Sequence, residues 1–581
     1  MKTTRKFLIA SILVATTSLS SFASAEGFLS SLLGGGSKTG ADFKSMLSHV
    51  PANTVYMFAN KNPIPKDVMN FHLDRSQEMM ALISNMDTSA SANEDGTQVL
   101  FKAILDDLGS KLSEGKLEES GLSLKARYLV YGFDMVPVIR LSFANKDKLM
   151  ETLKRAEKKS GQKVKLTKCG SYDCFVQSDK KKDKSVAIVI LENQLAASVF
   201  SNSDKSMMID HLIGKAKPKE AYSEKMWDDF LKENSYKGFG EGFVNLLNLY
   251  NNNNDLIMDS INNNNEVASA FKGDVKLEGK KLERVFSEEN AKPCLAVVKD
   301  HLENIPEIIF GTKSIETKQL DYEIVVKTSS AVSDVLQGIA NKTNIEKHLE
   351  NAIFDIGINI NFTKLRDALT QYSNFLIKSG EEHKCKSIDK KDIRKGMGGM
   401  MMAMNMGFSQ FNSIYASVAD IELDEKMQPK KVDAYISIGA NDPSKLIGMV
   451  GMFSPALMGF QVPADGSTVK LPKGAIPSRG MPLPEISLNR TKDTLNIMIG
   501  NDKPKLKDYK SDKPEILSFG MDGKRYYEKF TQLMKAIPQA KGADQDQATK
   551  MMEAMGKMSG KIQQEVTADK RGLVINYHMQ Y

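Results

Sequence analysis

The sequence predicts a mixed α+β fold made of two related lobes, in which antiparallel sheets carry helices packed on one face. Short runs of alternating or continuous apolar residues, bounded by turn residues, are typical of strands. Segments with apolar residues at helical spacing, and Lys or Glu between them, are typical of surface helices. The strand patterns follow one another through short links, which favours antiparallel pairing. Similar strand–turn–helix segments recur in the same order in both halves, which indicates an internal duplication.

The first 25 residues have the pattern of a signal peptide. A positively charged start precedes an apolar run at residues 7–14, and Ala23-Ser24-Ala25 forms a small-residue cleavage site. We expect cleavage after Ala25 and a periplasmic protein. The apolar run is too short to span a bilayer, so we expect no transmembrane span in the mature chain.

The mature chain divides into three predicted parts. Residues 26–45 are rich in Gly and Ser and predict a flexible lead-in. Residues 46–340 and residues 345–581 are then the first and second α+β lobes.

Individual elements follow from local patterns. Strands are predicted at residues 126–133, 185–191, 414–423 and 573–577, where apolar residues alternate or run between turn residues. Residues 146–159 predict an amphipathic helix. Asn and Asp in the turns before this helix and before its counterpart in the second half predict N-caps, because their side chains accept hydrogen bonds from free backbone N–H groups.

Three pairs of segments carry the duplication. Residues 137–150 (PVIRLSFANKDKLM) resemble residues 432–447 (VDAYISIGANDPSKLI), each reading as a strand, a small-residue turn and a helix. Residues 54–62 pair with residues 352–360, and residues 193–206 pair with residues 493–506. All three matches have an offset of about 300 residues, and their order is the same in both halves.

The four cysteines are even in number, which in an exported protein predicts disulfides. Cys169 and Cys174 flank a short turn between two strand-like runs, so a bond between them is geometrically easy. Cys294 and Cys385 would then form the second bond, although three connectivities are open in principle. Scattered sulfurs without a CxxC motif do not favour a zinc site.

The start of the mature domain carries a resemblance to a known family. Residues 51–56 read Pro-Ala-Asn-Thr-Val-Tyr before a predicted strand, and Tyr131-Gly132-Phe133 follows later. This resembles an uncharacterised family of secreted or periplasmic proteins of Gram-negative bacteria whose mature domain opens with a Pro-Ala-Asp-Thr-type motif. Asn53 stands here where the family has Asp. The resemblance implies an envelope location and no particular activity.

Catalytic motifs are absent from the sequence. It contains no G-x-S-x-G, H-E-x-x-H or P-loop pattern, and none of its seven histidines lies three or four residues from another. No catalytic residue, metal ligand or cofactor is therefore predicted. A net charge of +7 on 581 residues is mild and predicts no nucleic-acid partner.

Methionine is unusually frequent, with 32 residues, and it is clustered. The segment at residues 396–407 reads GMGGMMMAMNMG. Its methionines are Met397, Met400, Met401, Met402, Met404 and Met406. Flexible thioethers suit core packing and adaptable binding surfaces, and they are also soft ligands for Cu(I). All three interpretations are open, and copper is limited by the lack of His or Cys within the segment.

A second candidate segment lies at residues 445–460 (KLIGMVGMFSPALMGF), which is almost free of charge. Its candidate binding residues are Leu446, Met449, Met452 and Phe453. A helix that is apolar all round is either deeply buried or covers another apolar surface. Together with the Met-rich segment, it makes the second lobe the better candidate for an apolar site.

These observations favour a non-enzymatic periplasmic envelope protein that binds an apolar ligand, a lipid or a protein partner through the Met-rich second lobe. Two alternatives are a hydrolase whose site is assembled from distant residues and a periplasmic copper-binding protein. Ionisable side chains with perturbed pKa values in a cleft would favour the hydrolase. Converging thioethers near Cys385 or His383 would favour copper.

Overall fold

The computed structural model divides into two compact units, which are described separately. The first comprises Met1–Val275 and Pro306–Tyr322, and the second comprises Lys276–Ile305 and Glu323–Tyr581. The structure describes residues 42–72, 75, 103–104, 107–108, 110–111, 116–122, 126–133, 136–161, 163, 165–179, 183–252, 288–341, 352–386, 388–405, 411–423, 429–453, 457, 460–472, 475, 484–500, 514–536 and 543–581. The predicted signal peptide at residues 1–25 lies outside them, and the predicted lobe boundary at residues 340–345 stays a prediction.

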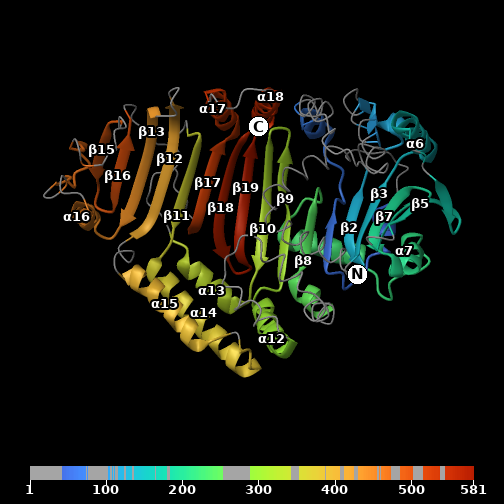
Figure 1. Cartoon of the computed structure of the whole chain (residues 1–581), viewed down its shortest axis with the longest axis horizontal. Helices are drawn as coiled ribbons and strands as arrows, with labels where there is room; N and C mark the ends of the chain where they lie inside the picture. Colours follow the sequence, from blue (N-terminus) through green and yellow to red (C-terminus); the bar gives the residue numbers. More distant parts are fainter. Residues whose placement is uncertain are drawn as a thin grey trace. The chain divides into compact units, whose positions relative to one another are not determined.

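Both units are mixed α+β, and every registered strand pair is antiparallel, as the sequence predicts (Figure 1). The described elements of the first unit are α3 (Phe43–Leu47), β1 (Tyr56–Ala59), η1 (Leu117–Ser120), β2 (Tyr128–Phe133), β3 (Val136–Ser142), α6 (Lys146–Ser160), β4 (Leu166–Cys169), β5 (Tyr172–Asp179), β6 (Lys184–Ile190), β7 (Gln194–Ser201), η2 (Asn202–Asp204), α7 (Lys205–Leu212), α8 (Glu224–Asn234), β8 (Glu241–Asn245) and β9 (Glu307–Glu316). Its strands pair in the order β4–β5–β6–β7–β3–β2–β1–β8–β9.

The division between the units falls within β10 (Gln319–Lys327). The described elements of the second unit are α12 (Glu288–Asn304), α13 (Ser330–Ile339), β11 (Phe354–Asn359), α14 (Phe362–His383), α15 (Lys390–Asn405), β12 (Phe411–Leu423), β13 (Pro429–Ala440), α16 (Pro443–Phe453), β14 (Val469–Lys470), β15 (Ile486–Arg490), β16 (Thr494–Ile499), β17 (Glu515–Asp522), α17 (Gly523–Ala536), α18 (Ala543–Met558), β18 (Lys561–Asp569) and β19 (Gly572–Gln580). Its strands pair in the order β14–β15–β16–β13–β12–β11–β17–β18–β19.

The predicted helix caps are present. The Asn145 side chain accepts a hydrogen bond from the Lys148 N–H at the start of α6. Asp442 accepts from the Ser444 N–H at the start of α16. The lead-in predicted at residues 26–45 ends earlier than expected, because α3 begins at Phe43, whose ring packs against Trp227 at a centroid distance of 6.0 Å. That contact buries Phe43, and its burial fixes the helix.

The first unit buries a charged side chain, that of Arg140, among the buried residues of its sheet. Arg140 of β3 is fully buried, and its guanidinium donates to the Tyr131 hydroxyl, to Gln194 and to the backbone carbonyls of His211 and Leu212 at the end of α7. The Tyr131 hydroxyl also lies 2.8 Å from Nε2 of His211. Arg140 therefore donates to two carbonyls at the C-terminal end of α7, and the His211 carbonyl also accepts from the Gly214 N–H.

Two ionic and covalent links organise the second unit. The Arg571 guanidinium forms two hydrogen bonds, of 3.0 and 2.8 Å, to the nearly buried carboxylate of Glu323. This bidentate geometry is the strongest form of carboxylate recognition, and it ties β10 to the turn before β19. The Cys294–Cys385 disulfide joins α12 to the second residue after the end of α14.

Both disulfides pair the cysteines as the sequence favours, so this prediction is confirmed. Cys169 and Cys174 are bonded across the turn between β4 and β5, and Cys294 is bonded to Cys385. The first bond closes a sequence separation of 5 residues and the second a separation of 91 residues. Because a longer closed loop removes more entropy from the unfolded chain, the second bond is the stronger constraint.

We expect replacement of Cys294 and Cys385 by Ser to destabilise the protein by roughly 4 kcal/mol, against roughly 2 kcal/mol for the same replacement of Cys169 and Cys174. Urea denaturation followed by far-ultraviolet circular dichroism measures both losses. The short-loop pair is the matched control. Equal losses from the two double variants would contradict the entropic account.

We also expect the first unit to lose stability as the pH falls below about 6.5. Burial lowers the pKa of His211 to about 4, with the charge of Arg140 adding to the effect. Burial lowers the pKa of His49 to about 3, with further contributions from Arg140 and His211. The folded state therefore keeps both imidazoles neutral while the unfolded chain takes up protons near pH 6.5. Each histidine then contributes a loss of up to about 1.4 kcal/mol per pH unit, which continues until the pH reaches its folded pKa.

Trp227, the single tryptophan of the chain, is fully buried in the first unit, so its fluorescence reports the unfolding of this unit. Urea denaturation at about pH 7.5 and about pH 5.5 measures the loss. In the variant His211→Gln the pH dependence should decrease by up to one proton. An unchanged pH dependence in this variant would show that His211 does not carry it.

Candidate functional site

The sheet of the second unit buries a polar face and leaves an apolar face open. In β11, Asp355 and Asn359 are almost fully buried, whereas the alternate residues Phe354 and Ile356 are 37% and 39% exposed. An antiparallel sheet with one solvated face normally has its polar residues outward. Strand β11 has the opposite arrangement, and the strands paired with it have the same arrangement of polar and apolar residues.

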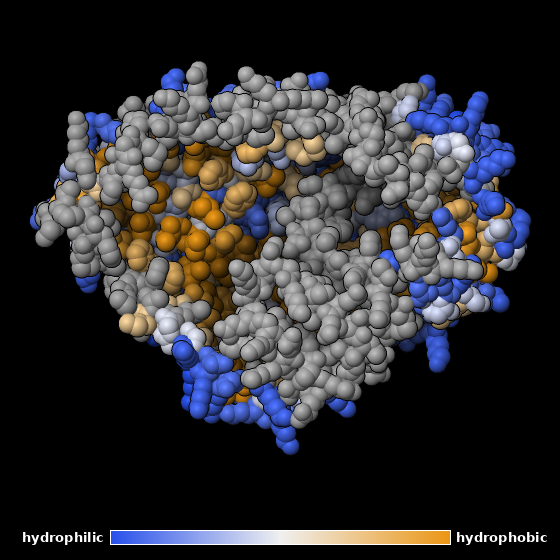
Figure 2. Space-filling view, viewed as in Figure 1, coloured by the Kyte–Doolittle hydropathy of each residue, from blue (hydrophilic) through white to orange (hydrophobic). Residues whose placement is uncertain are grey.

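Cross-strand pairing extends both faces over the central strands. On the open face, the row through Phe354 pairs it with Val418 on β12 and with Met521 on β17, and Val418 pairs with Ala434 on β13. The next row is also mostly apolar and contains Ile356, Ala416, Ile436, Ile497 and Phe519. The opposite face carries the buried residues Asp355, Ser413, Tyr415, Ser417, Asp433, Tyr435, Ser437 and Ser518. Figure 2 shows hydrophobic residues gathered in a hollow over the strands that Figure 1 labels β11, β12 and β13.

Two glycines make the polar face close-packed. A Cβ at Gly520 would collide with the Asp355 carboxylate, and a Cβ at Gly357 would collide with the Ser518 hydroxyl. Polar side chains therefore lie flat over neighbouring strands, where a larger residue would not fit. The opposite, apolar face is the one that is accessible to solvent.

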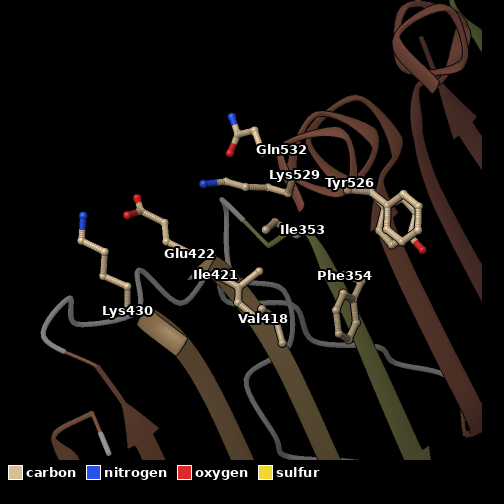
Figure 3. Close-up of a pocket in the computed structure, with 10 residues that line it drawn as sticks. Ile353, Phe354, Val418, Ile421, Glu422, Lys430, Tyr526, Lys529 and Gln532 are labelled. Carbon is tan, nitrogen blue, oxygen red and sulfur yellow. The ribbon is translucent and has the colours of Figure 1, made fainter. Parts of the chain in front are cut away.

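One end of the apolar face forms a pocket of about 350 Å³. Phe354, Val418 and Ile421 line it from the strands, and Tyr526 and Phe530 line it from α17. Its polar lining residues are Glu422, Lys430, Lys529 and Gln532. In Figure 3, Lys529 and Gln532 extend from the helix and Glu422 and Lys430 rise from the ends of β12 and β13, while Phe354 and Val418 lie lower, on the strands. The volume is at the small end of the range for ligand pockets, about 300–1,000 Å³.

One of the lysines at the pocket is held in place. The Lys529 ammonium lies 2.7 Å from a carboxylate oxygen of Asp420, which also accepts from Lys431 at 3.3 Å. Burial acts to raise the pKa of Asp420, but the hydrogen bonds from Lys529 and Lys431 outweigh it and hold the pKa below its ordinary value. Asp420 is therefore ionised at neutral pH and fixes Lys529 beside the pocket.

This arrangement suits noncovalent binding of an apolar group. The pocket joins apolar side chains to a charged rim, so it can bury a chain of methylenes and leave a polar end in water. Burial of apolar surface is favourable by roughly 25 cal/mol for each Å² removed from water. Isolated exposed apolar side chains need no explanation, whereas larger contiguous apolar patches are typical of interaction surfaces and ligand grooves.

The Met-rich segment lies on a different element from this pocket. Met397, Met401 and Met404 on α15 are half-buried, and Met402 is 64% exposed. The side chain of Met400 and the whole of Met406 lie outside the described residues. Figure 1 draws α15 beside α14, on the other side of the strands from α17. A binding role for these methionines stays a prediction.

The second predicted segment forms α16 and covers one edge of the apolar face. Leu446 is buried in a cluster with Ala440 and Leu495, and Ile438 and Ile447 pack against them. This agrees with the expectation that the uncharged helix covers an apolar surface. The side chains of Met449, Met452 and Phe453 lie outside the described residues, so their binding role also stays a prediction.

Sequence reasoning missed the residues of the pocket. The alternation at residues 354–359 predicts a strand, but period-two alternation does not tell which face meets solvent. Tyr526 and Phe530 carry a possible signal, because they are aromatic residues one turn apart on an amphipathic helix. Nothing in the sequence joins that helix to Phe354, which lies more than 170 residues earlier.

A Ser–Asp–His cluster joins α12 and α14. The Asp300 carboxylate accepts hydrogen bonds from the Ser379 hydroxyl at 2.5 Å and from Nε2 of His383 at 3.0 Å. Burial acts to raise the pKa of Asp300, but these two hydrogen bonds outweigh it and lower the pKa. A nucleophilic triad needs the imidazole between the hydroxyl and the carboxylate, whereas here the carboxylate lies between the other two. The cluster therefore links the two helices and does not activate the serine.

A buried carboxylate in the first unit is also satisfied by the protein. Burial raises the pKa of Glu241 to about 7, although the N–H groups of Gly238, Phe239 and Gly240 donate to its oxygens at 2.9–3.0 Å and act to lower the pKa. These donors come from the turn before β8. Glu241 thus organises its own turn, and its oxygens face backbone donors.

The described part of the chain contains no group of three or more His, Cys, Asp or Glu side chains arranged to hold a metal ion. None of its helices combines the length and the hydropathy needed to cross a bilayer.

Comparison with known proteins identifies no relative: no protein-family model, curated protein or solved structure matches the chain.

We expect truncation on the open face to cost little stability and truncation at its covered edge to cost much more. Ile356→Ala should destabilise the protein by less than about 1 kcal/mol, because this side chain is already 39% exposed. Leu495→Ala should cost about 2–5 kcal/mol, because Leu495 is buried under α16. Urea denaturation of the two variants measures the difference, and equal losses would mean that the face is covered in solution.

Proposed function

We propose that this protein is a non-catalytic, exported binding protein that holds the apolar chain of a lipid on the open face of the second unit. The observation that carries the proposal is the exposure of Phe354 and Ile356 beside the pocket while the polar residues of the same strand are buried. Apolar side chains are unfavourable in water, so a ligand that covers them binds with a favourable free energy. The charged rim at one end suits a ligand with a polar head.

Export is part of this proposal and has two supports. The N-terminal sequence has the pattern of a cleaved signal peptide, with cleavage after Ala25. Two disulfides use all four cysteines, and such bonds persist in oxidising compartments such as the bacterial periplasm. A periplasmic protein with an open apolar face is in a position to meet envelope lipids. We propose the same location that the resemblance to secreted proteins of Gram-negative bacteria implies.

We further propose that the two lobes arose by internal duplication. The order β6–β7–β3–β2–β1–β8–β9 in the first unit corresponds strand for strand to β15–β16–β13–β12–β11–β17–β18 in the second. In both, a helix follows the third strand of this order, α6 after β3 and α16 after β13. The corresponding segments are those that the sequence comparison aligns.

The first unit also exposes apolar residues on the corresponding face of its sheet. Ile139 on β3 is 48% exposed, and Ile188 on β6 is 37% exposed. Both pair with Ala197 of β7, so they lie in one row across three strands. In the same strand order of the second unit, Ile436 of β13 pairs with Ile497 of β16, as Ile139 of β3 pairs with Ala197 of β7. An open apolar face is therefore common to both units, which supports an inherited binding surface.

The test is lipid binding by the full-length mature protein after removal of bound lipid. A fluorescent fatty acid is displaced by unlabelled fatty acids of increasing chain length. Each buried methylene contributes roughly 0.8 kcal/mol, so the affinity should rise by up to about fourfold per methylene until the face is filled. An affinity that is independent of chain length would contradict burial of the chain.

A matched pair of variants locates the site. We expect the double variant Phe354→Ser, Ile356→Asn to weaken binding about tenfold or more, because it makes the centre of the open face polar. Val298→Asn is the control, since Val298 on α12 is 44% exposed and does not line the pocket. If both variants bind as the unmodified protein does, the lipid occupies another surface.

A further inference from the structure

We infer that the pocket selects a lipid with a zwitterionic headgroup, in which Lys430 binds the phosphate and Glu422 binds the amine. This inference rests on the proposed binding of a lipid chain and names the class of lipid. It follows from the charges at the rim, from their partners, and from their place above the apolar part of the pocket.

Some of the charged side chains at the rim of the pocket already form ion pairs within the protein, and others do not. Lys529 is held by Asp420 at 2.7 Å, and Lys431 bridges Asp420 and Asp433 at 3.3 and 2.9 Å. These groups neutralise one another. Among the described residues, in contrast, neither Glu422 nor Lys430 has an ion-pair or hydrogen-bond partner.

Within the described part of the chain, one carboxylate and one ammonium without a partner therefore border the same pocket. They come from the end of β12 and the start of β13, two strands that pair with each other, and Glu422 lies opposite Lys431, the neighbour of Lys430. Figure 3 draws both side chains on the same side of the pocket, with Ile421, Val418 and Phe354 lower in the view. A chain in the pocket would thus place its head between the two charges.

A zwitterionic head matches this rim better than an anionic one. A lipid with a single negative charge would find Lys430 but would also face the Glu422 carboxylate, and like charges in proximity are unfavourable. A phosphate linked to an ammonium can satisfy both side chains together. Gln532, which also lines the pocket, can add a neutral hydrogen bond to the phosphate.

The experiment compares three ligands that share one oleyl or oleoyl chain and differ in their head. They are lysophosphatidylethanolamine, which is zwitterionic, lysophosphatidylglycerol, which is anionic, and oleyl alcohol, which is neutral. Displacement of a fluorescent fatty acid from the full-length mature protein gives the three affinities. We expect the unmodified protein to prefer the zwitterionic lipid to the anionic one by about three- to fivefold, the size expected for partly exposed charge contacts.

Two single variants separate the two contacts. Glu422→Gln should abolish the preference for lysophosphatidylethanolamine over lysophosphatidylglycerol. Lys430→Gln should weaken both phospholipids by about threefold or more and leave oleyl alcohol unchanged. Lys364→Gln and Glu382→Gln, at exposed positions of α14, make the same changes of net charge away from the pocket and should alter none of the affinities.

The failures of the two proposals are distinguishable. If all three ligands bind and the rim variants leave their ratios unchanged, the headgroup inference is wrong while chain binding stands. A preference for the anionic lipid in the unmodified protein also overturns the headgroup inference. If even oleyl alcohol fails to bind, the proposed function is wrong and the headgroup inference falls with it.

Discussion

Strand β11 places its residues alternately on the two faces of the second unit's sheet, and the chemistry of both faces follows from this constraint. Asp355, Gly357 and Asn359 are directed to one side, where glycines at positions 357 and 520 leave room for carboxylate and hydroxyl groups to lie flat. Because successive residues of a strand point to opposite faces, Phe354 and Ile356 are directed to the other side. A shift of the strand by one residue would exchange the two faces, so the pairing register maintains the open apolar surface.

The elements around this sheet stabilise it without closing the apolar face. Helix α16 covers one edge through Leu446, and α17 borders the pocket with Tyr526 and Phe530. The Cys294–Cys385 bond and the hydrogen bonds of Asp300 join α12 to α14, while Arg571 and Glu323 tie β10 to the turn before β19. A sheet packed on both faces is stabilised by burial of its apolar residues. In this unit, the disulfide and the hydrogen bonds between other elements contribute stability in place of that burial. They explain how an open face persists in a folded protein.

The two units use buried charge differently. In the first unit Arg140 is enclosed by carbonyls, a hydroxyl and an amide, and burial depresses the pKa values of the neighbouring histidines. That cluster organises the end of a helix and makes the unit sensitive to acid. In the second unit charged groups lie at the edge of an apolar pocket, where Lys529 and Lys431 are paired with Asp420. Among the described residues Glu422 and Lys430 have no such partner, and the proposed headgroup contact uses these two side chains.

The sequence by itself predicted the class of fold, the antiparallel strands, the caps of α6 and α16 and, as the favoured one of three connectivities, the pairing of the four cysteines. These features depend on local patterns, on short separations or on elimination among four cysteines. It also predicted that the uncharged helix α16 is buried or covers an apolar surface, and Leu446 of this helix is buried against Ala440 and Leu495. Only the tertiary structure decided which face of β11 is open, because alternation gives two faces and does not say which one the rest of the chain buries. The pocket could not be predicted either, since Phe354, Ile421 and Tyr526 are distant in sequence and meet only when β11, β12 and α17 are packed together.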